Sequence, residues 1–192
     1  MFVIYRFDVL GAEKNNPFTP RPTRRAPSNV PYLVDNLWEW RRPAHFPNRR
    51  HSVYASPSAA QARESGVASQ GAVFRVEIDD PHAKIAQLNI KDAKHLDEIA
   101  RLMKLLPSCL GPAWPTLPLA EKTALAPLWA PCLSAEEVES LFAHPSLLAS
   151  RDKVWEAIRF WDEAQLIPGD GELAHPEGEL FFEAAAWKLW PL

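Results

Sequence analysis

The spacing of apolar positions changes along the chain and separates strand-like from helix-like segments. Residues 2–9 and 52–55 are rich in β-branched and aromatic side chains, and residues 180–185 form another apolar run. Residues 72–78 alternate apolar side chains with Arg75 and Glu77, which is the period of a pleated strand. We therefore predict strands at these four segments.

Helical spacing appears in five other segments, at residues 31–42, 59–64, 92–106, 134–143 and 151–165. Ser134 and Glu137 have the spacing of a capping box. Ser56 or Ser58 can cap the helix at 59–64, and Gly66 can end it in a left-handed conformation.

Proline interrupts two long stretches, residues 11–29 and 107–131, which are predicted to be irregular. The chain thus begins with strands, continues with helices and closes with a strand. This order favours an α+β fold over a series of βαβ units.

The length of 192 residues predicts a single domain over residues 1–192, because two separate cores would be cramped. Hydrophobic residues make up 47% of the chain, enough for a packed core. The net charge of −3 disfavours a general nucleic-acid binder, since neutralising phosphates needs a surplus of Lys and Arg.

No segment reaches the length of a membrane span. The first apolar run ends at Arg6 and is too short for the apolar part of a signal peptide. We therefore expect a protein that is made in the cytoplasm and does not engage membranes. Secretion, or delivery as an effector, would need a dedicated route.

Arginine is concentrated in the first quarter of the chain, at positions 21, 24, 25, 41, 42, 49 and 50. Acidic residues predominate between positions 134 and 183. Two interpretations stay open: two solvated faces of opposite sign, or a basic mouth for an anionic ligand such as a diphosphate.

Common catalytic and nucleotide-binding motifs are absent: the sequence contains no GxGxxG, P-loop, HExxH or GxSxG. The six histidines are scattered without the spacing of metal ligands, so no metal site is predicted.

Three local groupings could nevertheless carry chemistry. In Tyr5-Arg6-Phe7-Asp8, an arginine inside an apolar strand needs a partner, either Asp8 or a ligand phosphate. In Tyr54-Ala55-Ser56-Pro57-Ser58, a strand runs into a helix start, which is either a plain cap or a place for polar ligand groups. In Glu177-Gly178-Glu179, two carboxylates precede an apolar strand and can lean into a cleft or belong to the solvated surface.

In this order the groupings resemble the Arg–Ser–Glu class of ADP-ribosyltransferases, the class of cholera and pertussis toxins. Residues 5–8 resemble its opening Tyr-Arg-x-Asp strand, residues 54–58 its aromatic-x-Ser-Thr-Ser segment, and residues 177–179 its Glu-x-Glu turn. The likeness covers residues 4–9, 51–78 and 177–183. It implies a split β-sandwich with a mainly helical insertion at residues 92–165.

The resemblance implies NAD as the substrate and gives each site residue a role. Arg6 would anchor the active-site loop or the NAD phosphate, and Ser56 would order the cleft, with His51 and Tyr54 also contacting NAD. Glu179 would hydrogen-bond the nicotinamide ribose and stabilise the oxocarbenium-like transition state, which needs a well-placed negative charge. Glu177 would orient or deprotonate the acceptor.

The chain departs from the family pattern at several places. Pro57 stands where threonine is expected, about a hundred residues separate the second and third motifs, and Glu183 competes with Glu179 as the acid. The opening Tyr-Arg also resembles RES-type toxins, which degrade NAD. The strand at Tyr54 resembles tRNA 2′-phosphotransferases.

The resemblance therefore implies an NAD-dependent mono-ADP-ribosyltransferase of the bacterial toxin or effector kind. Its acceptor would be a macromolecule, a protein before a nucleic acid, and an immunity or antitoxin protein could accompany it. Two alternatives stay open. One is an NAD glycohydrolase with water as acceptor. The other is a non-catalytic interaction module that docks a partner through Trp38, Trp40, Trp114 and Trp129.

Overall fold

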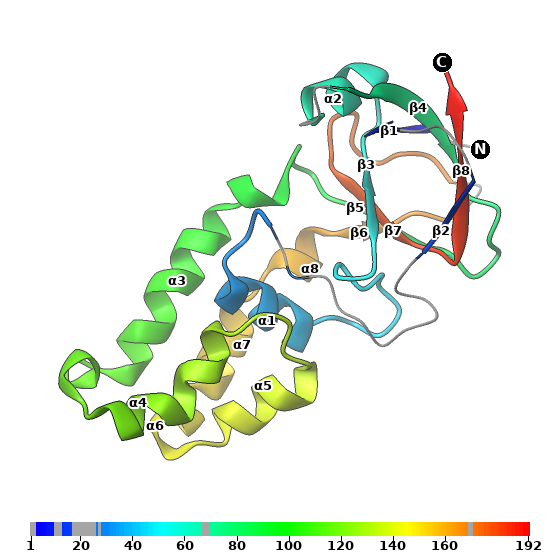
Figure 1. The fold of residues 1–192 in the computed structure, drawn as a ribbon. Coiled ribbons are helices and arrows are strands. Elements are labelled where there is room, and N and C mark those ends of the chain that lie inside the picture. Colours follow the sequence, from blue (N-terminus) through cyan, green and yellow to red (C-terminus); the bar gives the residue numbers. More distant parts are fainter. Residues whose placement is uncertain (1–2, 10–12, 17–25, 27, 67–69, 169–170) are drawn as a thin grey trace. The chain divides into compact units, whose positions relative to one another are not determined.

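The computed structural model describes residues 3–9, 13–16, 26, 28–66, 70–168 and 171–192 (Figure 1). The chain forms two compact units, each assembled from segments that are separate in the sequence. The β unit comprises Met1–Arg24, Ala44–Ala93 and Glu163–Leu192. The helical unit comprises Arg25–Pro43 and Lys94–Asp162. With antiparallel sheets and helices in separate parts of the chain, the predicted α+β class is confirmed.

The β unit contains two four-stranded antiparallel sheets, ordered β1-β4-β8-β2 and β3-β7-β5-β6. Their strands are β1 (Ile4–Asp8), β2 (Glu13–Asn15), β3 (Val53–Ala55), β4 (Ala72–Glu77), β5 (Lys84–Gln87), β6 (Gln165–Leu166), β7 (Leu180–Glu183) and β8 (Ala186–Pro191). A single bridge between Tyr5 and Ser56 connects β1 of the first sheet to the end of β3 in the second.

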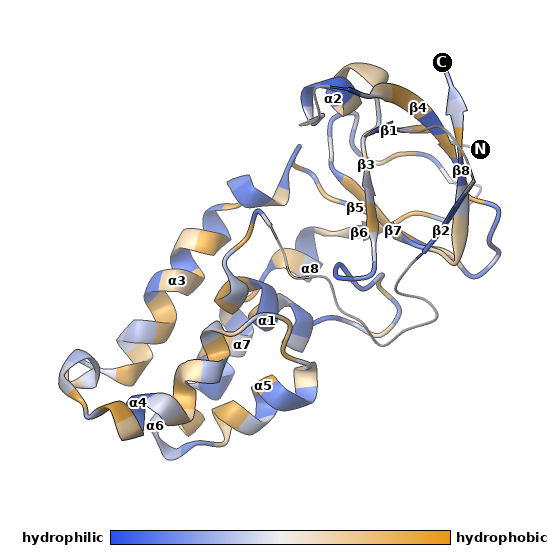
Figure 2. Cartoon of the chain, viewed as in Figure 1, coloured by the Kyte–Doolittle hydropathy of each residue, from blue (hydrophilic) through white to orange (hydrophobic). Residues whose placement is uncertain are grey.

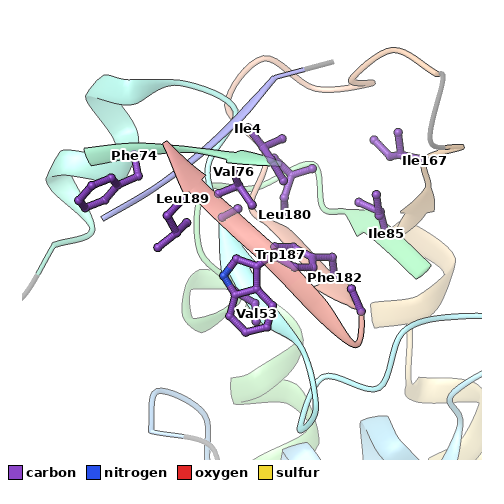
Figure 3. Close-up of a cluster of buried hydrophobic side chains, with 12 residues drawn as sticks. Ile4, Val53, Phe74, Val76, Ile85, Ile167, Leu180, Phe182, Trp187 and Leu189 are labelled. Carbon is purple, nitrogen blue, oxygen red and sulfur yellow. The ribbon is translucent and has the colours of Figure 1, made fainter. Parts of the chain in front are cut away.

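One hydrophobic core serves both sheets (Figure 3). Ile4 and Val76 come from the first sheet, and Ile85, Leu180 and Phe182 come from the second. Since side chains alternate along a strand, Phe181 must point to the face opposite Leu180 and Phe182. The second sheet therefore has one face in this core and one face carrying Phe181.

Helix α2 (Ala59–Glu64) packs on β1 and β4. Of the two predicted caps it uses Ser58, whose hydroxyl accepts a hydrogen bond from the N–H of Gln61 at 3.3 Å. Ser56 pairs with Tyr5 through its backbone. The prediction that Gly66 ends this helix in a left-handed conformation is wrong. The helix is capped by Ser65 in the right-handed region, and Gly66 has no positive φ.

The helical unit contains α1 (Tyr32–Trp40), α3 (Asp97–Leu110), α4 (Leu119–Leu125), α5 (Ala135–Phe142), α6 (Pro145–Leu148), α7 (Arg151–Ala157) and most of α8 (Phe160–Glu163). Short 3-10 helices form at Ala93–His95, where the β unit ends, and at Trp114–Thr116 and Ala126–Trp129. Hydrophobic and hydrophilic residues alternate along the ribbon of α3, and Glu98, Leu102 and Leu106 on one stripe are buried (Figure 2).

Tryptophan packing forms the centre of the helical unit. Trp38 stacks on Phe160 with ring centroids 4.3 Å apart, and its indole N–H donates to Glu98 at 2.9 Å. Trp40 stacks on Phe142 at 4.5 Å. Trp38 and Trp40 are only 1% and 5% exposed, so the two tryptophans in α1 serve the core.

Four strands escaped the sequence prediction, and one of them, β6, has two residues, of which Gln165 lies within the helix predicted at 151–165. Strand β2 lies in the stretch 11–29 that was predicted to be irregular, and its three residues are polar because they pair along the edge of a sheet. Strand β5 has only four residues. Strand β8 follows β7 after a two-residue connection at residues 184–185, where the chain passes from the second sheet to the first, so the strand predicted at 180–185 ends at Glu183 and a separate strand follows it.

Two helix boundaries also differ from prediction. Helix α3 continues past Pro107 to Leu110, giving up one backbone hydrogen bond inside the helix. The helix predicted at 151–165 is divided into α7 and α8 because buried Ile158 adopts an extended conformation between them.

Candidate functional site

Arg6 and Ser56 lie together where the two sheets join. Tyr5 and Ser56 exchange both backbone hydrogen bonds, at 2.8 and 2.7 Å. Arg6 follows Tyr5 and shares a strand face with Ile4. Its Nη1 donates to the carbonyl oxygen of Tyr54 at 2.7 Å, and its Nε donates to Asp8 at 3.1 Å. The guanidinium thus ties the first sheet to the strand that carries Tyr54.

Asp8 is held in its charged form beside Arg6. Burial is the largest single effect and raises the pKa of this carboxyl. Hydrogen bonds from Arg6 and from the Val9 N–H lower the pKa, as do the positive charges of Arg6 and Lys14, and together they outweigh burial. The net pKa of Asp8 lies below its ordinary value. The ion pair that the sequence suggested for Arg6 is therefore present, in addition to the bond to Tyr54.

Ser56 and Glu179 directly follow and precede the paired residues of β3 and β7. Tyr54 pairs with Phe181, and Ala55 pairs with Leu180. Continued by one residue, this antiparallel register sets Ser56 opposite Glu179. Both side chains then point to the face that carries Phe181, away from the core. The β3–β7 pairing thus brings the chain at Ser56 and at Glu179 to one end of the second sheet, and the Tyr5–Ser56 bridge joins β1, which carries Arg6, to the same end.

The segment after β5 holds Glu179 by its backbone and by its side chain. The N–H of Leu88 donates to the Glu179 carbonyl at 2.9 Å, and the Glu179 N–H donates to the Ile90 carbonyl at 2.8 Å. The Glu179 carboxylate accepts a hydrogen bond from the Ala93 N–H at 2.9 Å. A carboxylate fixed in this way has little freedom to turn, which suits a group that must stabilise positive charge.

Glu177 stands apart from this arrangement. Its side chain is 66% exposed and forms an ion pair with Lys91 at 3.6 Å. An exposed pair of this kind contributes little to stability and exchanges readily with water. The two acids of the Glu-x-Glu turn thus have different surroundings.

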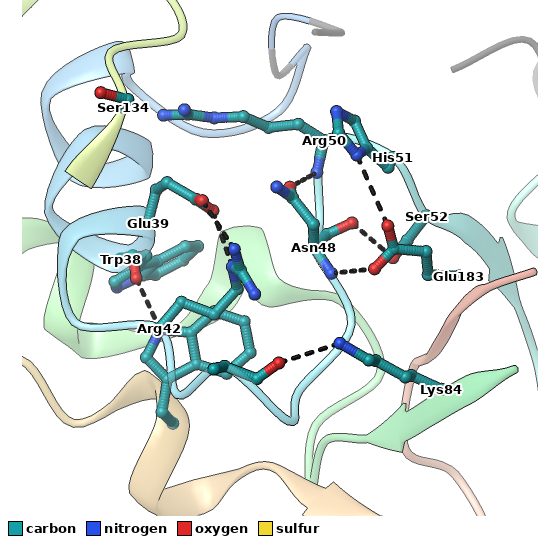
Figure 4. A network of polar contacts seen from close by, with 12 residues as sticks. Trp38, Glu39, Arg42, Asn48, Arg50, His51, Ser52, Lys84, Ser134 and Glu183 are labelled. Atoms are coloured by element: carbon teal, nitrogen blue, oxygen red, sulfur yellow. Dashed lines mark hydrogen bonds and ion pairs between the residues drawn. The ribbon is translucent and has the colours of Figure 1, made fainter. Parts of the chain in front are cut away.

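His51 lies beside Glu183, the other candidate acid, which is the last residue of β7 (Figure 4). The Nδ1 of His51 lies 3.5 Å from Glu183, and the N–H of Asn48 donates to the same carboxylate at 2.9 Å. Glu183 follows Glu179 by four residues, a span of roughly 13 Å along an extended chain. The predicted residues therefore form two clusters, one around Glu179 and one around Glu183.

Tyr54 lies between the two clusters, packed across from Phe181 with ring centroids 6.3 Å apart. Arg49 covers both rings, its guanidinium 5.8 Å from the centre of the Tyr54 ring and 5.9 Å from that of Phe181. The Arg49 side chain also reaches the Tyr54 hydroxyl, which in turn donates to the Arg49 carbonyl at 3.2 Å. Tyr54 is thereby fixed as part of the sheet face.

The described arginines of the first quarter are divided between the two units. Arg41 pairs with Asp162 and Arg42 pairs with Glu39, both at 3.0 Å within the helical unit. Arg49 and Arg50 belong to the β unit and are only 5% and 3% exposed. Arg21, Arg24 and Arg25 lie outside the described residues.

Sequence reasoning missed Asn48 and Gln87. Asn48 contributes its N–H to Glu183, and Gln87 holds the turn that precedes Glu179. Neither belongs to a motif, and each acts on a residue about ninety positions or more away. No local signal marks such residues.

Two hollows of about 590 and 380 Å³ open on the β unit, and neither is lined by Arg6, Ser56 or Glu179. Among the described residues, no helix is long and apolar enough to cross a bilayer. Within the same residues, no group of three or more His, Cys, Asp or Glu side chains is arranged to hold a metal ion.

The chain matches no protein-family model, no curated protein and no solved structure.

Proposed function

We propose that the β unit is an NAD-dependent mono-ADP-ribosyltransferase with a split β-sandwich of the ADP-ribosyltransferase kind. The observation that carries the proposal is the strand pairing that joins β1 to the end of β3 beside Ser56, with Arg6 bound to the Tyr54 carbonyl, and pairs β3 with β7, the strand that Glu179 precedes. These strands lie in three separate segments of the chain, and no local pattern would require their pairing.

The proposed chemistry needs little from the protein beyond placement and charge. The bond between the nicotinamide nitrogen and ribose C1′ breaks, and its electron pair leaves with nicotinamide, which becomes neutral. Glu179 stabilises the positive charge that develops on the ribose. Arg6 binds the diphosphate or fixes the adjoining loop, while Ser56, His51 and Tyr54 order the bound NAD.

The ADP-ribosyl group then passes to a nucleophile on the acceptor. A bond forms between C1′ and the acceptor atom, whose proton goes to Glu177. The acceptor is a macromolecule, a protein before a nucleic acid, as in bacterial toxins and effectors. Such a protein would be made in the cytoplasm of its producer, with an immunity protein to restrain it, and would reach a target cell through a dedicated route.

NAD hydrolysis is the second candidate, favoured by the position of Glu177. Its carboxylate is 66% exposed and lacks the fixed surroundings of Glu179, and a water acceptor, unlike a macromolecule, needs no docking surface beside it. The docking module suggested by the tryptophans is disfavoured, because Trp38 and Trp40 are buried in the helical unit.

One experiment separates these functions. The protein is incubated with NAD labelled in its adenylate phosphate, with and without total cell protein and total RNA, and nicotinamide release is followed. Release together with label on macromolecules supports the transferase. Release without label supports the glycohydrolase, and the absence of both release and NAD binding refutes both enzymes.

Glu177→Gln refines this comparison. The transferase predicts that the substitution lowers label transfer by about tenfold or more while nicotinamide release persists, because only the acceptor loses its base. Glu172→Gln, which removes an exposed acid from the same segment, is the matched control and should change neither rate.

A further inference from the structure

Gln87 makes three hydrogen bonds with the backbone of the turn that leads into Glu179. It ends β5 and is completely buried. Its Nε2 donates to the carbonyls of His175 and Gly178, at 2.6 and 3.2 Å. Its Oε1 accepts a hydrogen bond from the N–H of His175 at 3.1 Å. One side chain thus satisfies three backbone groups of a turn about ninety residues later in the sequence.

The backbone of this turn lies directly against the end of β5. A Cβ atom at Gly178 would stand 1.8 Å from the carbonyl oxygen of Leu88, a distance that no side chain can occupy. The Leu88 N–H, in turn, donates to the Glu179 carbonyl at 2.9 Å. The turn is therefore held at both of its ends by β5 and the residue that follows it.

Gln87 acts from the side of the sheet opposite the Glu179 carboxylate. It pairs with Leu180 in the β5–β7 register and shares a strand face with the core residue Ile85. Glu179 and Phe181 point to the other face. Gln87 consequently has no access to a ligand bound beside Glu179, and any effect it has on that ligand passes through the backbone.

We propose that Gln87 is a positioning residue for Glu179, an inference that rests on the proposed NAD chemistry. By fixing the backbone from His175 to Gly178, it keeps the Glu179 carboxylate at the end of the second sheet to which β1 is joined. A displacement of about 1 Å at a reacting group can cost on the order of a hundredfold in rate. Loss of the Gln87 amide frees the turn to make such a displacement.

The test compares Gln87→Leu with Asn36→Leu. Asn36 is an equally buried amide in the helical unit that also makes three backbone bonds, to the carbonyls of Leu128 and Ala130 and the N–H of Leu133. The two variants therefore lose a similar set of bonds at different places. The measurements are kcat and KM for nicotinamide release from NAD, and hydrogen exchange at the amides of Leu88 and Glu179.

Gln87→Leu is expected to lower kcat by about ten- to a hundredfold with KM within about twofold of wild type, because binding groups elsewhere are untouched. It should also speed exchange at Glu179. Asn36→Leu should leave kcat and this exchange unchanged, although both variants unfold more easily. If Gln87→Leu does not fold, Gln87→Met replaces it. That variant keeps the length and volume of the side chain but makes none of the three hydrogen bonds, so kcat should still fall.

Two outcomes overturn the inference separately from the proposed function. If wild type is active and Gln87→Leu keeps its kcat, or loses no more than Asn36→Leu does, Gln87 is only structural. The inference also fails if exchange at Glu179 is as slow in Gln87→Leu as in wild type. If wild type releases no nicotinamide at all, the proposed function fails and the inference falls with it.

Discussion

Tyr5 and Ser56 exchange both of their backbone hydrogen bonds, at 2.8 and 2.7 Å, and this pair joins the two sheets of the β unit. The join explains why residues so far apart in sequence can form one site. Arg6 is the next residue after Tyr5, and Glu179 lies across from Ser56 when the β3–β7 register is continued. The arrangement is thus defined by backbone pairing rather than by flexible side chains.

Arg6 should matter for both stability and activity. Arg6→Ala removes the bonds to Tyr54 and Asp8, and is expected to cost about 1–3 kcal/mol in the free energy of unfolding. Arg6→Lys keeps the charge but not the two-pronged geometry, so nicotinamide release should fall about tenfold or more in both variants. Urea unfolding and nicotinamide release measure these effects.

Arg75→Ala is the control for Arg6, since Arg75 is an exposed arginine on the neighbouring strand β4. It should change stability by less than about 0.5 kcal/mol and leave nicotinamide release unaltered. Full activity in Arg6→Lys would show that the position needs only a positive charge.

Gly178→Ala should displace the turn before Glu179. Its Cβ would meet the Leu88 carbonyl at 1.8 Å, so the backbone must move, and we expect a loss of about 1–3 kcal/mol in unfolding free energy. Gly111→Ala is the contrasting variant. Gly111 has φ 80 and ψ 171, and a Cβ added there would meet nothing within 4 Å, so its cost is conformational, about 1–3 kcal/mol. Only Gly178→Ala should reduce nicotinamide release. Equal activity losses in the two variants would contradict a specific role for the turn.

Asp80 should make stability depend on pH in the acid range. Its carboxylate accepts hydrogen bonds from the N–H groups of Ala185 and His82, at 2.8 and 2.9 Å, and these bonds hold its pKa below the ordinary value. Because the folded pKa is lower than the unfolded one, the stabilisation is complete above the unfolded pKa. It is lost as pH falls from there through the folded pKa.

Unfolding of wild type and Asp80→Ala across this range checks the expectation. The difference in unfolding free energy between the two proteins should be largest near neutral pH and shrink on acidification. A difference that stays constant down to the lowest pH would show that the Asp80 charge plays no part in holding the turn between β7 and β8.

Local patterns were sufficient to predict the elements whose signals lie within a few residues. The alternation around Arg75 predicted β4, and Ser134 with Glu137 predicted the start of α5, where the capping box is present. Strand β8 escaped although Trp187 and Leu189 alternate with Lys188, because a four-residue strand and a two-residue turn precede it without glycine or proline to separate them.

The candidate site was less accessible to sequence reasoning. Arg6 could be singled out because a charged residue in an apolar strand needs partners, and Asp8 is the one that local spacing indicated. Its second partner, the carbonyl of Tyr54, is 48 residues away, and nothing in the sequence specifies it. The separation of His51 and Glu183 from Ser56 and Glu179 likewise depends on strand register, which tertiary pairing determines.

The most direct test of the account compares Glu179→Gln with Glu183→Gln in the release of nicotinamide from NAD. Both substitutions remove one charge from the same sheet face, about 13 Å apart. If Glu179 stabilises the ribose cation, Glu179→Gln should lower kcat by about a hundredfold or more, while Glu183→Gln stays within a few-fold of wild type. A large loss in Glu183→Gln with little change in Glu179→Gln would contradict this assignment and move the reaction to the cluster of His51 and Asn48.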